Sequence, residues 1–493
     1  MTLDQWQTPI LSALKHSSYR PHAPFYAPGH KRGQGASPLL REMLGPAALQ
    51  IDLPELPELD NLFAPEGVIR QAQALAAEAF GADQTYFLAN GSTCGIEAAI
   101  LATCGPGDKI IVPRNAHRSV MAGLVLTGAM PVFVAPDYAP DLGLTLGLSV
   151  DAIATALRHY PDCRAVLVVS PTYHGVCSDI EAIAALTQAN QIPLLVDEAH
   201  GAHFTFHPLL PETALSRGAD LVVQSTHKVL GALSQASMLH TRGHRVDSAR
   251  LRAALQLTQS TSASYVLLAS LDAARQQMAT GGYDLLAQTV DLAIDLRARL
   301  ATLPPLGVVT PEAVTAFDNA QALDLTRLTV DVAGLGITGL QADEVLHAEL
   351  GVTAELPELR HLTFMVTLGN TREDGTRLVD GCRTLRDRFA PSAHHSPTAI
   401  YPSTTAAPPP WSLPQVTPRE AFFASTKTLS AEAAVGYLSA ETIAAYPPGI
   451  PALVAGDVIT ADALHHLHTV KQQGGYVTGC GDLSLATLKV LHL

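Results

Sequence analysis

Lysine is scarce in this chain. Only seven of the 493 residues are lysine, and a single one, Lys228, lies between Lys109 and Lys427. Cationic residues number 31 and acidic residues 45, so the formal net charge is −14. Binding to nucleic acid by bulk electrostatics needs clustered lysine and arginine. The composition therefore argues against a nucleic-acid partner and suits a small cationic substrate.

The sequence also lacks long apolar runs and closely spaced cysteines. A membrane-spanning helix needs about 18 or more consecutive apolar residues, and no such run occurs. The N-terminal stretch has acidic and polar residues where a secretory signal has positive charges and a long apolar segment. The six cysteines show neither CxxC spacing nor the density of a secreted disulfide framework. We expect a cytoplasmic protein with reduced, mostly buried thiols and no membrane partner.

Residues from about 84 to 242 alternate short apolar, β-branched runs with helix-like stretches, one of which starts near Ile96. Continuous apolar strands separated by amphipathic helices are typical of a mainly parallel sheet that is covered on both faces. The seven strand-like runs begin near Thr85, Lys109, Pro131, Ala165, Pro193, Asp220 and Ala236.

A second, smaller α/β region follows a long helical pattern that ends near Leu303. Two strands are predicted, at 323–334 and 362–371. Two helices are also predicted, one at 342–350 and one that starts near Asp374. Residues 391–415 are rich in Pro, Ser and Thr, which predicts a linker. Ordered patterns return in 416–493, so the chain is long enough for three units.

Polar and ionisable residues collect where the predicted strands of the first region end. Ligands of parallel sheets bind beyond the carboxyl ends of the strands, so one shared pocket explains this clustering. The strand-end segments are Asn90-Gly-Ser-Thr93, Arg114-Asn-Ala-His117, Ser170-Pro-Thr-Tyr-His174, Asp197-Glu-Ala-His200 and Ser225-Thr-His-Lys228.

Lys228 follows the apolar run DLVVQST at one of these ends. An amine at the end of a strand suits Schiff-base chemistry, because desolvation and nearby cations lower its pKa and leave a neutral nucleophile. The alternative is a surface lysine in a chain where arginine has replaced most others.

The segment Gly91-Ser92-Thr93-Cys94-Gly95 leads from a strand into a helix. Small residues let backbone N–H groups approach an anion at the positive end of a helix, and the two hydroxyls add donors. Ordinary N-capping is the structural alternative. Neither GxGxxG nor GxxxxGK[ST] occurs in this segment, so a small phosphate ester is favoured over a dinucleotide or a nucleoside triphosphate.

Asp197 ends an apolar strand, and a carboxylate in a cleft needs a cationic partner such as a protonated pyridinium nitrogen. Glu198 is either structural or orients a neighbour. An imidazole such as His117 could stack on an aromatic cofactor. Zinc is the rival interpretation at His200 and His203, but HxxH spacing without a third ligand is weak, and we expect no metal. Together with Lys228 and Ser92, these residues meet the four requirements for holding pyridoxal 5'-phosphate.

With these motifs the chain resembles the fold-type-I, pyridoxal phosphate dependent ornithine, lysine and arginine decarboxylases. The resemblance covers nearly the whole chain, in the family's order. The matching segments are Ala27-Pro-Gly-His-Lys31, Leu59-Asp-Asn-Leu62, Asn90-Gly-Ser-Thr93, Arg114-Asn-Ala-His117, Ser170-Pro-Thr-Tyr-His-Gly175, Asp197-Glu-Ala-His-Gly201, Ser225-Thr-His-Lys228, Ala232-Leu-Ser-Gln-Ala-Ser237 and Tyr446-Pro-Pro-Gly-Ile-Pro451.

The resemblance implies roles for individual residues. Lys228 would bind the cofactor covalently, His117 would stack on its ring with Ala199 on the opposite face, and Asp197 would pair with the pyridine nitrogen. His200 or the released Lys228 would return a proton to Cα. The phosphate ligands would be Ser92, Thr93, Ser225 and His227, with Thr261 from the partner subunit.

The resemblance also implies an aspartate-aminotransferase-like fold with a seven-stranded, mainly parallel sheet, a smaller α/β domain and a C-terminal α+β domain. Five units are expected. An N-terminal segment (1–65) contributes to the dimer and the active site, and a large cofactor-binding domain (66–300) follows it. The remaining units are a small α/β domain (301–390), the linker (391–415) and a C-terminal domain (416–493). The chain resembles members without an N-terminal receiver-like domain. We expect a homodimer or a dimer of dimers with its active site at the subunit interface.

The expected reaction is decarboxylation of a small basic amino acid, with arginine to agmatine ahead of lysine to cadaverine or ornithine to putrescine. Glu441 is a candidate for the distal cation of the substrate, and helix capping is its alternative role. Another fold-type-I reaction, such as transamination, could use the same cofactor contacts. A non-catalytic homologue would lack one of the chemical residues, and all are present.

Overall fold

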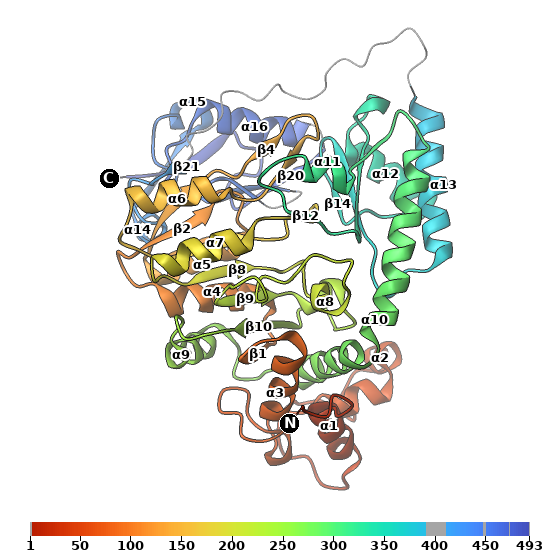
Figure 1. The fold of residues 1–493 in the computed structure, drawn as a ribbon. Coiled ribbons are helices and arrows are strands. Elements are labelled where there is room, and N and C mark those ends of the chain that lie inside the picture. The colour runs from red at the N-terminus through yellow and green to blue at the C-terminus, as the bar shows by residue number, and fades with distance from the viewer. Residues whose placement is uncertain (1, 391–410, 447–449, 473, 493) are drawn as a thin grey trace.

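The computed structural model describes residues 2–390, 411–446, 450–472 and 474–492 (Figure 1). Its main sheet has the strand order β1-β10-β9-β8-β6-β2-β3-β16. The seven predicted strands are all present, and a two-residue strand, β16 (Trp411–Ser412), adds to the edge at β3. The seven are β1 (Gln84–Leu88), β2 (Lys109–Pro113), β3 (Met130–Val134), β6 (Cys163–Val169), β8 (Leu194–Asp197), β9 (Leu221–Gln224) and β10 (Ser237–Thr241).

The main sheet is covered on both faces because its strands are apolar on both sides. In β8, Leu195 packs into a core with α4 (Gly91–Thr103), α5 (Arg118–Thr127) and α9 (Ser248–Thr258). The next residue, Val196, packs into the opposite core with α6 (Val150–His159) and α7 (Ile180–Ala189). Alternate residues of a strand face opposite sides. This confirms the predicted covered, mainly parallel sheet.

The first helix after β1 starts earlier than its apolar pattern indicated. The sequence predicted a start near Ile96, but α4 begins at Gly91. Gly91 has φ of +77°, and Val223 and Leu88 lie against Gly95 so closely that a Cβ there would clash. The prediction was wrong because glycine and hydroxyl residues are weak helix formers, whereas here the positive φ of Gly91 and the close approach of Gly95 to β1 and β9 require glycine.

A separate four-stranded antiparallel sheet has the order β11-β13-β15-β14. The predicted strands and helices correspond to β13 (Arg327–Asp331), β15 (His361–Met365), α12 (Gly339–Leu350) and α13 (Arg372–Phe389). These elements share one core with the end of α10 (Tyr265–Ala301), and Figure 1 shows α10 and α13 side by side. The remaining strands of this sheet are β11 (Gly307–Val308) and β14 (Leu356–Pro357).

The C-terminal part has its own core, in which α16 (Ala461–Gln472) packs on two small sheets. The sheets are β17–β21 and β19-β18-β20, with β17 (Thr426–Ser430), β18 (Ile443–Tyr446), β19 (Ile450–Leu453), β20 (Tyr476–Thr478) and β21 (Thr487–Leu491). Residues 391–410 of the predicted linker lie outside the described residues.

All six thiols are free, and five of them are buried. This confirms that the thiols are mostly buried, whereas their reduced state stays a prediction. Burial raises the pKa of Cys94 to about 12, which disfavours the reactive thiolate. None of the described helices combines the length and apolar character needed to cross a bilayer.

A buried ion pair on α10 docks the N-terminal segment. Arg275 Nη2 lies 2.5 Å from Asp272 Oδ1, and both side chains are fully buried. Arg275 also donates to the carbonyls of Gln5 and Gln7, at 2.8 and 2.6 Å. Asp272 Oδ2 accepts from the Ile10 N–H, at 2.9 Å, at the start of α1 (Pro9–Tyr19). The pair therefore satisfies backbone groups on either side of the start of α1.

Replacing Asp272 with asparagine is expected to release this segment. The substitution keeps the side-chain size but leaves the Arg275 charge buried without its counterion, a change that costs about 3–5 kcal/mol. Limited proteolysis should then cut the first 20 or so residues much faster than in the wild type. Asp295→Asn on the same helix is the matched control, because the exposed Asp295–Arg299 pair contributes about 0.3–0.5 kcal/mol. Equal cleavage of the two variants would contradict this account.

Candidate active site

The carboxyl ends of six strands meet at one edge of the main sheet. Strands β9, β8, β6, β2 and β3 are parallel, and β10 is antiparallel to both β9 and β1, so β1 has the same direction as β9. Lys228 lies directly beyond β9 in the short helix α8 (Thr226–Val229). The predicted strand-end segments therefore share one edge, as expected from the topology.

Lys228 and His200 are in direct contact. Lys228 Nζ lies 3.1 Å from His200 Nε2, and Arg327 Nη2 lies 2.9 Å from His200 Nδ1. An arginine can only donate, so Nδ1 is the acceptor and the proton of the neutral ring sits on Nε2. That proton points at Nζ, which accepts it only as an uncharged amine. The contacts thus select a neutral Lys228.

The electrostatic surroundings of Lys228 have the same effect as this hydrogen-bond chain. Burial lowers the pKa of Lys228, and the charge of Arg327 lowers it further, while Asp197 opposes the shift. Burial together with the charges of Lys228 and Arg327 keeps the pKa of His200 well below its usual value. Both groups are therefore biased towards their neutral forms, as a nucleophilic amine requires.

Arg327 is held in place by Asp324, which belongs to the connection before β13. Both side chains are buried, with Arg327 Nε 3.7 Å from Asp324 Oδ2. Asp324 Oδ1 accepts from Thr326 Oγ1 at 2.7 Å, and His203 Nε2 lies 3.2 Å from Asp324 Oδ2. Burial raises the pKa of Asp324, but His203 and Arg327 outweigh it and lower the value to about 2. His203 thus pairs with Asp324, while His200 faces Lys228, so the two histidines of the HxxH segment have different partners.

Asp197 and Glu198 point to opposite sides at the end of β8. Asp197 is buried and accepts a 3.2 Å hydrogen bond from the Ala199 N–H. Burial raises its pKa, and the nearby Lys228 opposes this shift. Glu198 accepts instead from the Ala214 N–H and from Gln224 Nε2, both at 2.7 Å. Burial raises the pKa of Glu198 to about 8.

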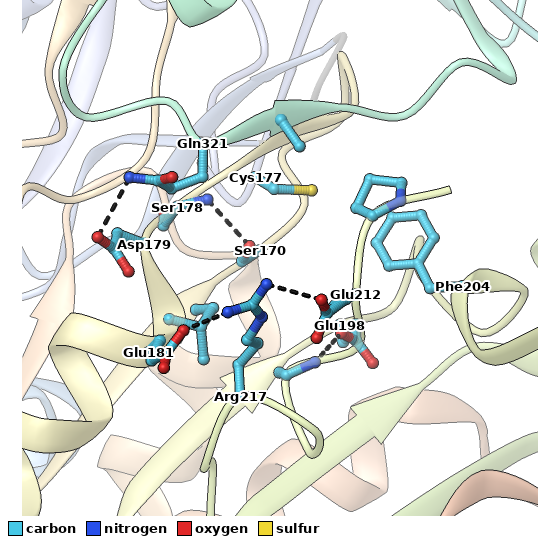
Figure 2. Close-up of a pocket in the computed structure, with 14 residues that line it drawn as sticks. Ser170, Cys177, Ser178, Asp179, Glu181, Glu198, Phe204, Glu212, Arg217 and Gln321 are labelled. Atoms are coloured by element: carbon cyan, nitrogen blue, oxygen red, sulfur yellow. Dashed lines mark hydrogen bonds and ion pairs between the residues drawn. The ribbon is translucent and has the colours of Figure 1, made fainter. Parts of the chain in front are cut away.

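Figure 2 shows Glu198 at the wall of a separate pocket of about 230 Å³. Arg217 crosses this pocket between Glu181 and Glu212. Lys228 does not line it. Of the two readings offered for Glu198, its hydrogen bonds support the structural one.

His117 is the N-cap of α5. Its Nδ1 accepts from the Ser119 N–H at 3.2 Å and lies 3.0 Å from Ser119 Oγ. Burial, with smaller effects of Lys228 and Arg118, lowers the pKa of His117 to about 4. The ring is therefore uncharged at ordinary pH, and its contacts at Nδ1 fix its orientation.

The structure brings two of the predicted phosphate ligands together. Ser225 Oγ donates to Ser92 Oγ at 2.8 Å, although the residues are far apart in sequence. His227 Nδ1 donates to the Ala236 carbonyl at 2.9 Å, so its Nε2 is the remaining polar atom. Thr93, in the first turn of α4, is exposed, and Ala199 is half-buried beside Asp197.

Glu441 and Thr261 lie apart from these contacts. Glu441 accepts from the N–H groups of Gly481 and Lys489, at 2.6 and 2.9 Å, so both its oxygens bind backbone of the C-terminal part. It lines a cavity of about 720 Å³ that also includes Arg118, the residue after His117. Thr261 is exposed on the loop between α9 and α10. Their predicted substrate and phosphate contacts stay predictions.

Pyridoxal phosphate fits this donor set. Lys228 offers a neutral amine, and Asp197 offers a buried carboxylate that has no ion-pair partner within 4 Å among the described residues. The paired hydroxyls of Ser92, in the first turn of α4, and of Ser225 suit a phosphate. These groups come from the ends of three strands, β1, β8 and β9, so one small molecule could touch all of them.

Sequence reasoning missed Arg327 and gave Tyr173 no role. Arg327 is the first residue of β13, in a segment whose pattern predicted only an apolar strand. The sequence did contain a signal, because a charged residue in a strand that is otherwise buried needs a partner. The Tyr173 ring packs on His200, with centroids 4.9 Å apart, and lies 5.9 Å from Lys228 Nζ. Both residues fix the histidine that faces the lysine.

Comparisons with known proteins extend over almost the whole chain. The family model of the Orn/Lys/Arg decarboxylase major domain matches residues 8–374. An arginine decarboxylase of Bacillus subtilis is 37% identical over 489 residues, which cover 99% of each chain. An arginine decarboxylase of Halalkalibacterium halodurans is 39% identical and covers 99% of this chain and 98% of that protein.

Solved structures of more distant proteins have the same fold. A Francisella novicida lysine decarboxylase superposes with a TM-score of 0.84 at 21% identity, over 98% of this chain and 81% of the other. The Escherichia coli constitutive lysine decarboxylase gives 0.81 at 21% identity, over 99% and 82%. These likenesses confirm the predicted fold class.

Removal of the Arg327 charge is expected to raise the pKa of Lys228. In Arg327→Met a nearby cation is lost, and His200 is free to place its proton on either nitrogen. The amine should then be less reactive at neutral pH, measured as the pH dependence of its reductive methylation in the cofactor-free protein, with peptide mass spectrometry. Arg327→Lys keeps a charge and should keep most of the depression.

Arg217→Met is the control, since Arg217 bridges Glu181 and Glu212 in the separate pocket. It should leave the Lys228 titration unchanged. The same Lys228 titration in Arg327→Met and in the wild type would contradict the role given to Arg327.

Proposed function

This chain belongs to the ornithine, lysine and arginine decarboxylase family, and we propose that it converts arginine to agmatine with pyridoxal 5'-phosphate bound at Lys228. The contact of Lys228 with His200, whose other ring nitrogen Arg327 holds, is the observation that carries the proposal. Arginine is preferred over lysine and ornithine because three relatives that are 37–39% identical, over 98–99% of either protein's length, are arginine decarboxylases. Family membership favours a carboxy-lyase over the transaminase and non-catalytic alternatives.

The residues of the strand ends would hold the cofactor as follows. Lys228 would bind it covalently, Asp197 would keep its ring nitrogen protonated, and the neutral His117 would stack on the ring opposite Ala199. The phosphate would be held by Ser92, Thr93, Ser225 and His227, with Thr261 of a second subunit. When bound, the cofactor supplies an electron sink for the electron pair that remains after carbon dioxide leaves.

His200 and Lys228 are the two groups placed to move a proton at the reacting carbon. In the observed contact, His200 carries its proton on Nε2 and Lys228 is its acceptor. With substrate at the site, the proton that its ammonium group gives up can pass to Lys228 or to His200, and either side chain, once protonated, can return a proton to Cα. Arg327 holds Nδ1 as an acceptor throughout, so any proton that His200 gives up comes from Nε2.

The substrate test uses the purified holoenzyme with arginine, lysine and ornithine in separate reactions. We expect carbon dioxide and agmatine in equal amounts from arginine, and slower release from the other two. Lys228→Ala should lose at least about 10³-fold in rate, and borohydride reduction should fix cofactor mass on the Lys228 peptide of the wild type. A keto acid in place of an amine would contradict decarboxylation, and cofactor fixed on another peptide would contradict the role of Lys228.

We also propose that the chain is a homodimer, or a dimer of dimers, with the active site at the subunit interface. Helix α2 (Pro38–Ile51) buries only Leu49 within the subunit and exposes apolar side chains. Met43 is 85% and Leu39 74% exposed, and Phe25 nearby in sequence is 96% exposed. An apolar surface of this kind calls for a covering partner, and a second copy would also supply Thr261. A cytoplasmic location stays a prediction.

Met43→Glu is expected to weaken the dimer, because a charge would be buried in an apolar interface. Sedimentation velocity should show dimers for the wild type and mainly monomers for the variant at micromolar concentration. Leu483→Glu is the matched control, since Leu483 is also exposed, at 63%, but belongs to the C-terminal part. A monomeric wild type, or a Met43→Glu protein that remains as dimeric as Leu483→Glu, would contradict the proposed interface.

A further inference from the structure

Two histidines and a glutamate that no step above uses converge beside the active site. His174 follows Tyr173 in the loop after β6, whereas Glu358 lies in the turn between β14 and β15 and His361 is the first residue of β15. One nitrogen or oxygen atom from each lies within 4.8 Å of the other two. Two segments that are 184 residues apart in sequence thus present three metal-binding side chains to one point.

The cluster is buried, and one of its nitrogens has no partner. His174 and His361 are 8% and 2% exposed. His174 Nε2 lies 2.7 Å from Glu358 Oε2, so these two form an ion pair or hydrogen bond. His361 Nε2 is buried and makes no hydrogen bond within the described part of the chain. An isolated His174–Glu358 pair would not require this second imidazole, and an unsatisfied buried nitrogen costs free energy.

We propose that His174, Glu358 and His361 bind a zinc ion. Two imidazoles and a carboxylate are a common zinc ligand set, with metal–ligand distances of about 2.0–2.2 Å. Tetrahedral ligands are then about 3.3 Å apart, so atoms now up to 4.8 Å apart need only small side-chain movements to close on the ion. The HxxH pair of His200 and His203 is a different set, and its members face Lys228 and Asp324.

The surroundings of the cluster admit a cation. The nearest arginine in sequence, Arg360, is paired with Asp331 at 2.7 Å and donates to the Asp141 carbonyl, so its charge is engaged elsewhere. The Glu358 side chain is 22% exposed, which provides a path from solvent. Two neutral imidazoles and one carboxylate leave a net positive charge on the bound ion, and water is the natural fourth ligand.

Such an ion would connect the main sheet to the small sheet next to the lysine. His174 belongs to the loop that carries Tyr173, whose ring packs on His200. Glu358 and His361 belong to the β14–β15 hairpin, and β15 pairs with β13, the strand of Arg327. The zinc site would therefore fix the two segments that position His200, a structural role that is independent of the proposed substrate.

The test measures zinc uptake by the holoenzyme. The protein is stripped with a chelator, loaded with Zn²⁺ alone, washed and analysed for metal, and Co²⁺ loading reports tetrahedral coordination through its visible absorbance. We expect about one zinc per wild-type chain and a rise in thermal midpoint on loading. Glu358→Gln, which keeps the side-chain shape, and His361→Gln should each lower zinc affinity by at least about tenfold.

His465→Gln combined with His468→Gln is the matched control. These histidines lie one turn apart on α16 and could collect zinc adventitiously. Their removal should leave the single tight site intact. The proposal is overturned if the wild type takes up no zinc, if Glu358→Gln and His361→Gln bind it as tightly as the wild type, or if only the α16 variant loses it. Circular dichroism of each variant shows whether a loss reflects unfolding.

Discussion

The uncharged state of one buried amine is the constraint on which the site depends. Lys228 is desolvated, and the proton on His200 Nε2 points at it. That proton is on Nε2 because Arg327 occupies Nδ1. An ammonium at this position would meet a donor in place of an acceptor and a second cation behind it. Hydrogen bonding, burial and charge therefore favour the same protonation state.

The alternation of side chains along a strand lets one segment serve both the site and the core. Asp197 and Glu198 are neighbours, yet Asp197 lies among the site residues while Glu198 accepts from Ala214 and Gln224. Glu198 thereby ties the end of β8 to β9 and to the segment at Ala214. This fixes the position from which Asp197 projects. The structural carboxylate of Glu198 therefore positions the neighbouring carboxylate of Asp197, which faces the site.

Much of the fold could be predicted from the sequence, and the reason is physical. Strands buried on both faces have to be apolar throughout, so all seven were visible as β-branched runs. Chemical residues at strand ends stood out against those runs, as Lys228 and Asp197 did. The start of α4 was missed because the positive φ of Gly91 and the tight packing at Gly95, and not helix propensity, decide it.

Contacts between distant segments left no local pattern to find. The role of Arg327 could not be predicted from a run that indicated only a strand. Arg327 and its partner Asp324 reach His200 only when the small sheet packs on the main one. The proximity of His174 and His361 could not be predicted for the same reason. Each is a single residue in a loop or strand end, and their proximity depends on the register of β15 against β13.

The small sheet therefore does more than cover one side of the site. It contributes Arg327 from β13 and His361 from β15, and both reach residues at the strand ends of the main sheet. A displacement of this sheet would withdraw the donor from His200 Nδ1 and remove a cation from the surroundings of Lys228. Since burial and that cation both lower the pKa of Lys228, such a displacement would raise this pKa and make the amine a poorer nucleophile. The packing of the small sheet against the main sheet is thus coupled to the pKa of Lys228. A ligand that binds between the two sheets would affect both.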